Sequence, residues 1–389
     1  MTKVDYPLFR VHVPIEKALK EIEKVFQSGF INEGVQVTEL TKRMQAQLET
    51  DNLCLVNSCT SALTLALKLS GVKPGSAVVS TPMTCLATNT PIVNLGADIE
   101  WADIDPWTGT IEPLSVIEAI QKVKSRAKKT SAIMAVDWAG NLCDYESLDK
   151  IASSYNVHLI RDAAHALLAR YDGVQAHVKP DFTTYSLQAI KHTTTGDGGI
   201  LVCKKESNLN RAKALKWFGI DRDQAKDTNG NWKGQHWDFD VEEAGFKFNM
   251  NNVSAAIGLA QTEYIELAIG KHKRNAKIYA ERFKEVESVK PLRLEHNSES
   301  SHWVYTVRLI EANEERRNYI LQKLNEKGVH AGVVHVPNHE YKCFEQYWKE
   351  LPGVEEFAAA QFALPCGWWM EEDDINKSFD ILKSVLKEE

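Results

Sequence analysis

The chain has 389 residues, of which 43% are hydrophobic and 25% charged, and this composition excludes long disordered tracts. At about 150 residues per domain, the length predicts two or three domains. The 46 Lys and Arg against 53 Asp and Glu residues leave a formal net charge of −7. Nucleic acid is therefore not expected as a partner, because neutralising phosphates requires a basic face. No apolar run reaches about 18 residues, so no membrane-spanning helix is expected.

The seven cysteines are scattered along the sequence and never form a Cys-x-x-Cys pair. Residues 1–7 contain no apolar leader segment. These features are typical of a reduced, cytoplasmic protein without a structural zinc site. A large cytoplasmic enzyme is the class that this composition favours.

The first elements in chain order are two helices. Apolar residues at helical spacing begin at Ile15 and stop at Ser28-Gly29, and a second helical stretch ends at about Leu48. Short apolar segments then alternate with helical ones to about residue 205, which indicates βαβ units and a largely parallel sheet. The predicted strands are 53–56, 77–80, 99–102, 132–136, 157–160 and 199–203, and the predicted intervening helices are 61–69, 114–123 and 145–155.

The pattern changes after residue 220. Residues 221–243 are rich in turn formers but contain two tryptophans, which predicts a loop that packs against another part of the protein. Residues 253–283 are expected to form one long helix, followed by a strand at 304–309 and helices at 316–327 and 375–386. The sequence thus predicts a large domain over residues 1–250 and a smaller α+β domain over 251–389.

The segment from Ser186 to Gly199 carries the strongest chemical signal. Lys191 follows a predicted strand within a run of apolar, small and hydroxyl residues, which suggests a closely packed turn rather than the usual solvated surface. Burial lowers the pKa of a lysine and makes its amine a nucleophile. The glycines could instead form a dinucleotide loop, but they lack the G-x-G-x-x-G spacing and precede a strand.

Asp162 ends a predicted apolar strand, and His165 follows three residues later. An Asp at this place can simply cap a turn. It can also serve as a carboxylate at the carboxyl edge of a parallel sheet, where open α/β folds bind ligands. A carboxylate for a pyridinium nitrogen, followed by a lysine, is the pattern that pyridoxal phosphate (PLP) requires.

A third segment, Asn57-Ser-Cys59-Thr60-Ser61, opens a helix directly after a buried strand. Helix N-termini bind phosphate through free N–H groups and the positive end of the dipole. Ordinary capping is the commoner use of Ser and Thr here, but three hydroxyl groups in four positions exceed the need of one cap.

Together these segments resemble the DegT/DnrJ/EryC1/StrS family of PLP-dependent sugar aminotransferases. The resemblance extends over nearly the whole chain. It implies the type I PLP-transferase fold, an α/β architecture in which a large domain has a mostly parallel seven-stranded sheet and a smaller α+β domain follows. The matching segments are 29–34, 57–63, 81–88, 136–140, 162–165, 186–199 and 245–251.

The resemblance also implies roles for individual residues. Lys191 would form the covalent Schiff base with PLP and move the proton, and Asp162 would keep the pyridine nitrogen protonated. His165 stands where the family places a Gln or His near the ring hydroxyl. The implied phosphate cup consists of Cys59, Thr60, Ser186 and, less directly, Gln188.

Three positions, in two segments, depart from the family pattern. Cys85 replaces a residue that is often aromatic and stacks on the cofactor ring, so another side chain could supply the stacking. Lys247 and Asn249 replace the Asn and Arg of a segment that, in the family, reaches the phosphate of a neighbouring subunit. A homodimer with shared active sites is nevertheless implied.

Two further residues are candidates for substrate contacts. His335 and His339 have H-x-x-x-H spacing, but Pro337 would disrupt the helix that a metal pair needs, so no metal is expected. In the resembling family this segment is a loop near the substrate, which makes His335 a substrate-binding candidate. Arg222 could pair with a phosphate or carboxylate, or could be an ordinary surface residue.

The function implied is transfer of the amino group of L-glutamate to a keto-sugar. The acceptor would be a nucleotide-linked 4-keto-6-deoxy sugar or an 8-oxo octulosonate, in the biosynthesis of lipopolysaccharide or another cell-surface polysaccharide. One alternative is a sugar 3-dehydratase of the same family, although that class replaces the lysine by His. The other is a non-catalytic PLP-binding regulator, although no segment is spare for a DNA-binding domain.

Overall fold

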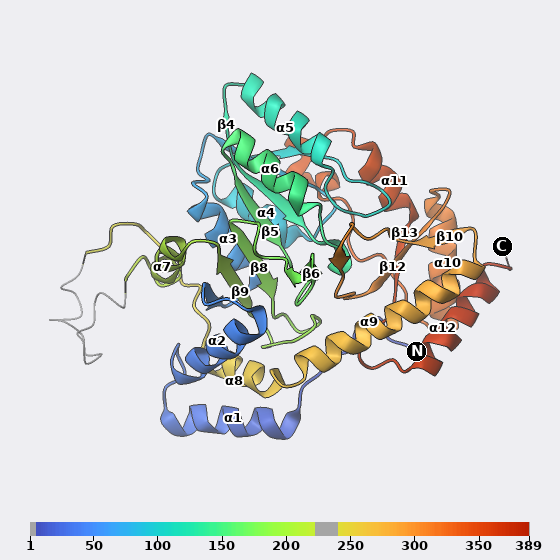
Figure 1. The fold of residues 1–389 in the computed structure, drawn as a ribbon, viewed down its shortest axis with the longest axis horizontal. Coiled ribbons are helices and arrows are strands. Elements are labelled where there is room, and N and C mark those ends of the chain that lie inside the picture. Colours follow the sequence, from blue (N-terminus) through green and yellow to red (C-terminus); the bar gives the residue numbers. More distant parts are fainter. Residues whose placement is uncertain (1–4, 222–239, 389) are drawn as a thin grey trace.

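The computed structural model describes residues 5–221 and 240–388. Its centre is a seven-stranded sheet in the order β1-β9-β8-β5-β4-β2-β3 (Figure 1). Only β9 runs antiparallel to its neighbours β1 and β8, and the other adjacent strands are parallel. The seven strands are β1 (Leu53–Val56), β2 (Ser76–Ser80), β3 (Asp98–Trp101), β4 (Lys129–Val136), β5 (His158–Asp162), β8 (Phe182–Ser186) and β9 (Gly199–Cys203).

Helices cover both faces of this sheet, because its strands bury side chains on both sides. In β4, Ile133 and Ala135 belong to one apolar layer, whereas Ala132 and Met134 belong to the opposite one. The helices from this part of the chain are α1 (Ile15–Ser28), α2 (Val35–Leu48), α3 (Cys59–Leu69), α4 (Leu86–Asn94), α5 (Pro113–Ser125), α6 (Tyr145–Tyr155) and α7 (Glu206–Leu215).

The C-terminal part forms a second, three-stranded sheet in the order β10-β12-β13, which Figure 1 shows at the right-hand end beside α10 to α12. Its strands are β10 (Val289–Pro291), β12 (Tyr305–Leu309) and β13 (Gln361–Leu364). A small third sheet consists of β6 (Arg170–Tyr171), β7 (Val174–Gln175) and β11 (Ser298–Glu299). The remaining helices are α8 (Asn252–Gln261), α9 (Ile265–Arg282), α10 (Glu314–Glu326), α11 (Pro352–Ala360) and α12 (Glu372–Val385).

The structure confirms the predicted fold class and most of the predicted elements. Four of them have the predicted bounds, namely α1, β1, β9 and α6, and most of the others differ by a few residues at one or both ends. Gly29 ends α1 with a φ of 67°, a left-handed conformation that favours glycine. The domain boundary near residue 250 stays a prediction. The N-terminal residues lie against a segment that is distant in the sequence, since Tyr6 forms a parallel β-bridge with Val329.

The prediction of one helix over 253–283 is wrong, since α8 and α9 are separate helices. The side-chain amide of Gln47 donates a hydrogen bond to the Thr262 carbonyl (2.7 Å), which gives this carbonyl a partner outside the helix. The Gln261 side chain likewise turns away from the helix to the Thr194 carbonyl. Within the described residues, no helix combines the length and the apolar character needed to cross a bilayer.

Candidate active site

The predicted nucleophile, Lys191, lies in the turn between β8 and β9, at the end of the sheet where β5 also ends. Its ammonium nitrogen is 3.7 Å from the ring centroid of Trp303. Burial lowers the pKa of Lys191 to about 8, although the neighbouring Cys85, Asp162 and Cys59 oppose this shift. At neutral pH a larger fraction of this amine is therefore uncharged than for a surface lysine, as a nucleophilic lysine requires.

Asp162 is the last residue of β5, and its carboxylate is held from two sides. Thr88 donates a hydrogen bond from Oγ1 to Oδ2 (2.7 Å), and the amide of Ala164 donates one to Oδ1 (3.1 Å). Thr88 is in turn bonded to the Thr84 hydroxyl at 2.8 Å. Burial raises the pKa of Asp162, and the two hydrogen bonds and the charge of Lys191 oppose that shift. The result is a fixed, buried carboxylate at the carboxyl edge of the sheet.

A buried ion pair supports the strand that carries Asp162. Arg161 Nε donates to Asp137 Oδ2 at 2.5 Å, and both side chains are fully buried. The other oxygen of Asp137 accepts from the Tyr145 hydroxyl at 2.7 Å. The Asp137 amide donates to the Asp162 carbonyl at 3.0 Å. These bonds tie the end of β4 to the end of β5 directly behind the candidate site.

His165 lies in an aromatic stack beside Lys191. Its ring is 4.0 Å from Trp303 with an interplanar angle of 13°, and 5.5 Å from His335 with an angle of 14°. Nδ1 accepts a hydrogen bond from the Ala139 amide (3.3 Å), so Nε2 carries the proton of the neutral ring. Burial, reinforced by Lys191, holds the pKa of His165 well below its usual range. Nε2 is buried without a partner and is free to donate to a bound group.

The first turn of α3 faces the same end of the sheet. Ser58 caps it by accepting a hydrogen bond from the Ser61 amide (3.1 Å). Cys59 is buried, and burial raises its pKa well above the usual range. Thr60 is exposed. The Ser58 hydroxyl is thus the helix cap, whereas the exposed Thr60 hydroxyl is available to a phosphate.

A close approach of backbones explains the glycine at the start of β9. A Cβ atom on Gly199 would lie 2.6 Å from the Cys59 amide nitrogen and equally close to the Ser58 carbonyl group. The glycine therefore allows β9 to pass under the first turn of α3. This packing role is the physical reason for Gly199, one of the glycines for which a dinucleotide loop was the alternative interpretation.

Replacing Gly199 by alanine is expected to lower the free energy of unfolding by about 1–3 kcal/mol, because backbone atoms have to move. Chemical denaturation would measure the change. Gly270→Ala is the control, since a Cβ atom at that position of α9 meets nothing within 4 Å and a helix favours alanine. An unchanged midpoint for Gly199→Ala would contradict the close approach.

Ser186 and Gln188 shape the turn that carries Lys191. The Ser186 hydroxyl accepts a hydrogen bond from the Gln188 amide (3.3 Å), and the Gln188 side-chain oxygen accepts one from the Ile190 amide (3.1 Å). The Lys191 amide donates to the Gln188 carbonyl at 3.0 Å. In this structure both side chains therefore order the lysine turn.

Lys247 and Asn249 lie on the strand-like segment that follows the undescribed residues 222–239. Lys247 is exposed, with its ammonium 2.6 Å from Asn249 Oδ1 and 3.5 Å from the Trp217 ring centroid. Asn249 is buried and donates from Nδ2 to the side chain of Asn32 (3.1 Å). The Asn57 side chain bonds the Lys247 carbonyl (3.3 Å), so the pair borders the entry to α3.

The loop of His335 forms one wall of a small pocket beside the lysine. Asn338 ties this loop to the other wall by donating from Nδ2 to the Thr84 carbonyl (2.7 Å). Burial and Lys191 lower the pKa of His335 to about 3, so the ring is neutral. Arg222 lies outside the described residues. The pocket has a volume of about 260 Å³ and is lined by Thr84, Cys85, Leu86, Val333, Val334, His335, Val336, Asn338 and Tyr341.

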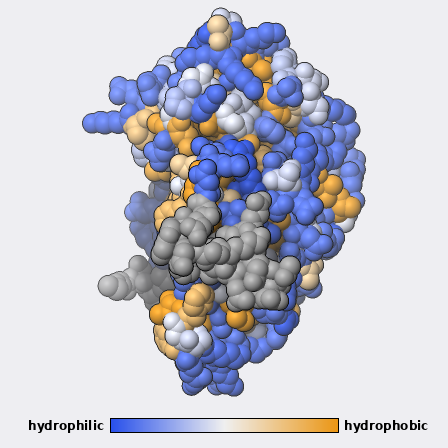
Figure 2. Space-filling view, turned by 90° about the vertical axis from the view of Figure 1, so that its left-hand side faces the viewer, coloured by the Kyte–Doolittle hydropathy of each residue, from blue (hydrophilic) through white to orange (hydrophobic). Residues whose placement is uncertain are grey.

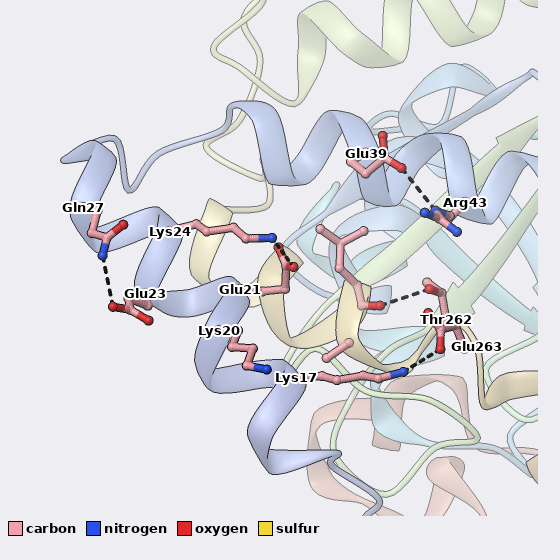
Figure 3. Close-up of a pocket in the computed structure, with 12 residues that line it drawn as sticks. Lys17, Lys20, Glu21, Glu23, Lys24, Gln27, Glu39, Arg43, Thr262 and Glu263 are labelled. Atoms are coloured by element: carbon pink, nitrogen blue, oxygen red, sulfur yellow. Dashed lines mark hydrogen bonds and ion pairs between the residues drawn. The ribbon is translucent and has the colours of Figure 1, made fainter.

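A larger groove of about 660 Å³ lies between α1, α2 and the end of α8 (Figure 3). Its charged side chains pair with one another, as in Lys17–Glu263 at 2.5 Å and Arg43–Glu39 at 3.1 Å. Solvated ion pairs of this kind carry no specific chemistry. Within residues 5–221 and 240–388, no group of three or more His, Cys, Asp or Glu is placed to hold a metal ion.

The arrangement fits PLP. Lys191 supplies the amine, Asp162 a buried carboxylate for the ring nitrogen, and His165 an unpartnered Nε2 for the ring hydroxyl. Sequence reasoning missed Trp303 and Thr88 as parts of this site. Thr88 lies in a segment that was already matched to the family. Trp303 is 112 positions after Lys191, and nothing in its local sequence distinguishes it from an ordinary core tryptophan.

Comparisons with known proteins place the chain in one family. Residues 14–383 match the model of the DegT/DnrJ/EryC1/StrS aminotransferase family. A UDP-4-amino-4,6-dideoxy-N-acetyl-beta-L-altrosamine transaminase of Campylobacter jejuni is 27% identical over 94% of both chains. The spore coat polysaccharide biosynthesis protein SpsC of Bacillus subtilis is 25% identical, over 96% of this chain and 95% of its own. The crystal structure of the sugar aminotransferase CalS13 from Micromonospora echinospora has a TM-score of 0.87 and 28% identity, covering 97% of this chain and 99% of its own.

These matches extend over nearly the whole length of the chain, and they confirm the resemblance, the fold class, the enzyme class and the cofactor that the sequence predicted. They leave the acceptor and the roles of individual residues untested. The chain belongs to the DegT/DnrJ/EryC1/StrS aminotransferase family and is a PLP-dependent aminotransferase.

Proposed function

We propose that this protein transfers the amino group of L-glutamate to a keto-sugar in the biosynthesis of a cell-surface polysaccharide. The observation that carries the proposal is the buried amine of Lys191 beside the buried carboxylate of Asp162, in a chain of this family. The names of these relatives refer to sugar transamination and to spore coat polysaccharide, which supports a sugar acceptor.

Bound PLP would supply an electron sink that stabilises negative charge at the carbon losing its proton. In our proposal Lys191 would hold the cofactor and would move the proton at the reacting carbon. Asp162 would favour the protonated form of the ring nitrogen, and Nε2 of His165 would be the donor for the ring hydroxyl. Thr60 and the first turn of α3 would hold the phosphate, and Cys59, Ser186 and Gln188 would shape that cup.

The acceptor would enter between Cys85 and His335. This pocket of about 260 Å³ is small and has no Asp, Glu, Lys or Arg in its lining, so the nucleotide or other large portion of an acceptor would extend beyond it. Both acceptor classes predicted from the sequence, a nucleotide-linked 4-keto-6-deoxy sugar and an 8-oxo octulosonate, remain within the proposal. We place the reaction in the cytoplasm, in keeping with seven free cysteines.

The proposal is tested by two half-reactions. PLP-loaded protein should lose its yellow absorbance when L-glutamate is added. The separated, amine-loaded protein should regain it with the true acceptor, in a screen of nucleotide-linked 4-keto sugars and oxo-octulosonates. Failure to react with L-glutamate would remove that donor. Release of a dehydrated sugar without amine transfer would instead favour the dehydratase alternative.

We also propose a homodimer whose active sites are shared. The support is a set of large apolar side chains exposed on α1, the following loop and the start of α2, including Leu19 at 61%, Phe26 at 59% and Val35 at 77%. The face in Figure 2 is mainly hydrophilic, and some of its scattered apolar groups lie in the lower part, just above the hydrophilic lower tip. The loop continues to Asn32, which contacts Asn249, so this surface borders the segment of Lys247 and Asn249.

Sedimentation is expected to give the mass of a dimer, and Leu19→Glu combined with Phe26→Glu should shift it to the monomer, because charges cannot be buried in an apolar contact. The control is Leu114→Glu, an equally exposed leucine on α5 (67%). A dimer that withstands the double substitution would place the interface elsewhere.

A further inference from the structure

Trp303 lies at the centre of an aromatic column that runs past the candidate nucleophile. Its ring stacks on Phe9 on one side (4.8 Å, 25°) and on His165 on another (4.0 Å, 13°). Its Nε1 donates a hydrogen bond to the carbonyl of Ile190, the residue before Lys191, at 2.8 Å. Trp303 is 3% exposed. The indole is therefore fixed by ring contacts and by a bond to the lysine turn itself.

The ammonium of Lys191 lies 3.7 Å from the Trp303 ring centroid, well within the range of about 6 Å for a cation–π contact. The carboxylate of Asp162 and the thiols of Cys59 and Cys85 also face Lys191 and favour its charged form. Burial favours the neutral amine and outweighs them. His165 and His335 also interact with Lys191, and both rings are neutral because burial lowers their pKa values.

We propose that Trp303 is a positioning residue for Lys191, whose indole face holds the ammonium beside Asp162 whenever the lysine is not bonded to the cofactor. This inference rests on the proposed role of Lys191. A ping-pong aminotransferase spends half of its cycle with the lysine free, and a free lysine side chain has several rotatable bonds. A ring that attracts the charged form keeps the amine within reach of the reacting carbon and limits how far burial lowers its pKa.

The test measures the pKa of Lys191 in cofactor-free protein, by labelling its amine competitively across pH and quantifying the modified peptide by mass spectrometry. Trp303→Phe keeps an aromatic face and should hold this pKa near that of the wild type. Trp303→Leu removes the face and should lower it by about one unit. The sign follows because cation–π attraction stabilises only the charged amine.

A purely structural role predicts the opposite sign. Loosening of the core admits water, which relieves desolvation and raises the pKa of a buried lysine. An unchanged or raised pKa in Trp303→Leu would therefore overturn the proposal. Trp101→Leu is the matched control, because Trp101 is as deeply buried but packs on Phe344 and should leave the pKa of Lys191 unchanged.

Fluorinated tryptophan keeps the test decisive if Trp303→Leu does not fold. Fluorine withdraws electron density from the ring face with little change of shape, which weakens the cation–π attraction. The pKa of Lys191 should therefore fall stepwise as fluorine atoms are added. A pKa that ignores fluorination would also overturn the proposal. Because no cofactor is present, these outcomes are independent of PLP binding. Failure of the proposed function would appear instead as the absence of a cofactor link at Lys191.

Discussion

Lys191→Ala is expected to abolish transamination, lowering the rate of the half-reaction with L-glutamate by at least about 10⁴-fold. The substitution removes both the amine that bonds to the cofactor and the group that carries the proton. Loss of absorbance after mixing PLP-loaded protein with L-glutamate measures the rate. The variant should still fold, because deleting a buried amine removes a desolvated group rather than a hydrogen bond of the core.

Two further variants separate this chemistry from a general effect of charge. Lys191→Arg keeps the positive charge but cannot form the covalent link, so it should be as inactive as Lys191→Ala. Lys204→Ala, an exposed lysine just after β9, should leave the rate unchanged. A Lys191→Ala protein that reacts at a rate near that of the wild type would show that another amine carries the reaction.

Asp162→Asn is expected to lower the same rate by about 10²-fold or more, because a neutral amide cannot stabilise the protonated ring nitrogen. The amide has nearly the shape of the carboxylate. Its single oxygen can still accept from the Ala164 amide, and its NH2 group can donate to the Thr88 hydroxyl, which would then accept, so the fold should be little affected. The affinity for PLP should fall as well. Absorbance titration of cofactor-free protein measures the affinity, and the mixing experiment measures the rate.

Asp181→Asn is a matched control for this amide substitution. The Asp181 carboxylate also accepts a hydrogen bond from a backbone amide, that of Leu159 (3.0 Å). However, Asp181 precedes β8 and therefore lies at the opposite edge of the sheet. It should leave the rate and the affinity unchanged. Equal losses in both variants would mean that the effect of Asp162→Asn is structural.

Much of the fold follows from local patterns. The strand of residues 53–56 and the helix of 145–155 are bounded by turn formers and have one clear periodicity, so their limits were predicted to the residue. The break between α8 and α9 could not be predicted, because it depends on bonds to Gln47 and Thr194, which are distant in sequence. A continuous helical pattern does not reveal such tertiary contacts.

The candidate site was predictable where its residues follow consecutive strands. Asp162 ends β5 and Lys191 follows β8, and parallel neighbours bring their carboxyl ends to one edge. Trp303 comes from the loop before β12 of the second sheet, and its ring stacks with Phe9 from near the N-terminus. Their meeting depends on how the two sheets pack, which no local pattern contains.

The most direct test of the central claim is where PLP attaches. PLP-loaded protein reduced with borohydride and digested should carry the cofactor mass on the peptide containing Lys191, at about one equivalent per chain, and adding L-glutamate before the reduction should remove it. Attachment to a different lysine, or a Lys191 peptide without the added mass, would contradict the account.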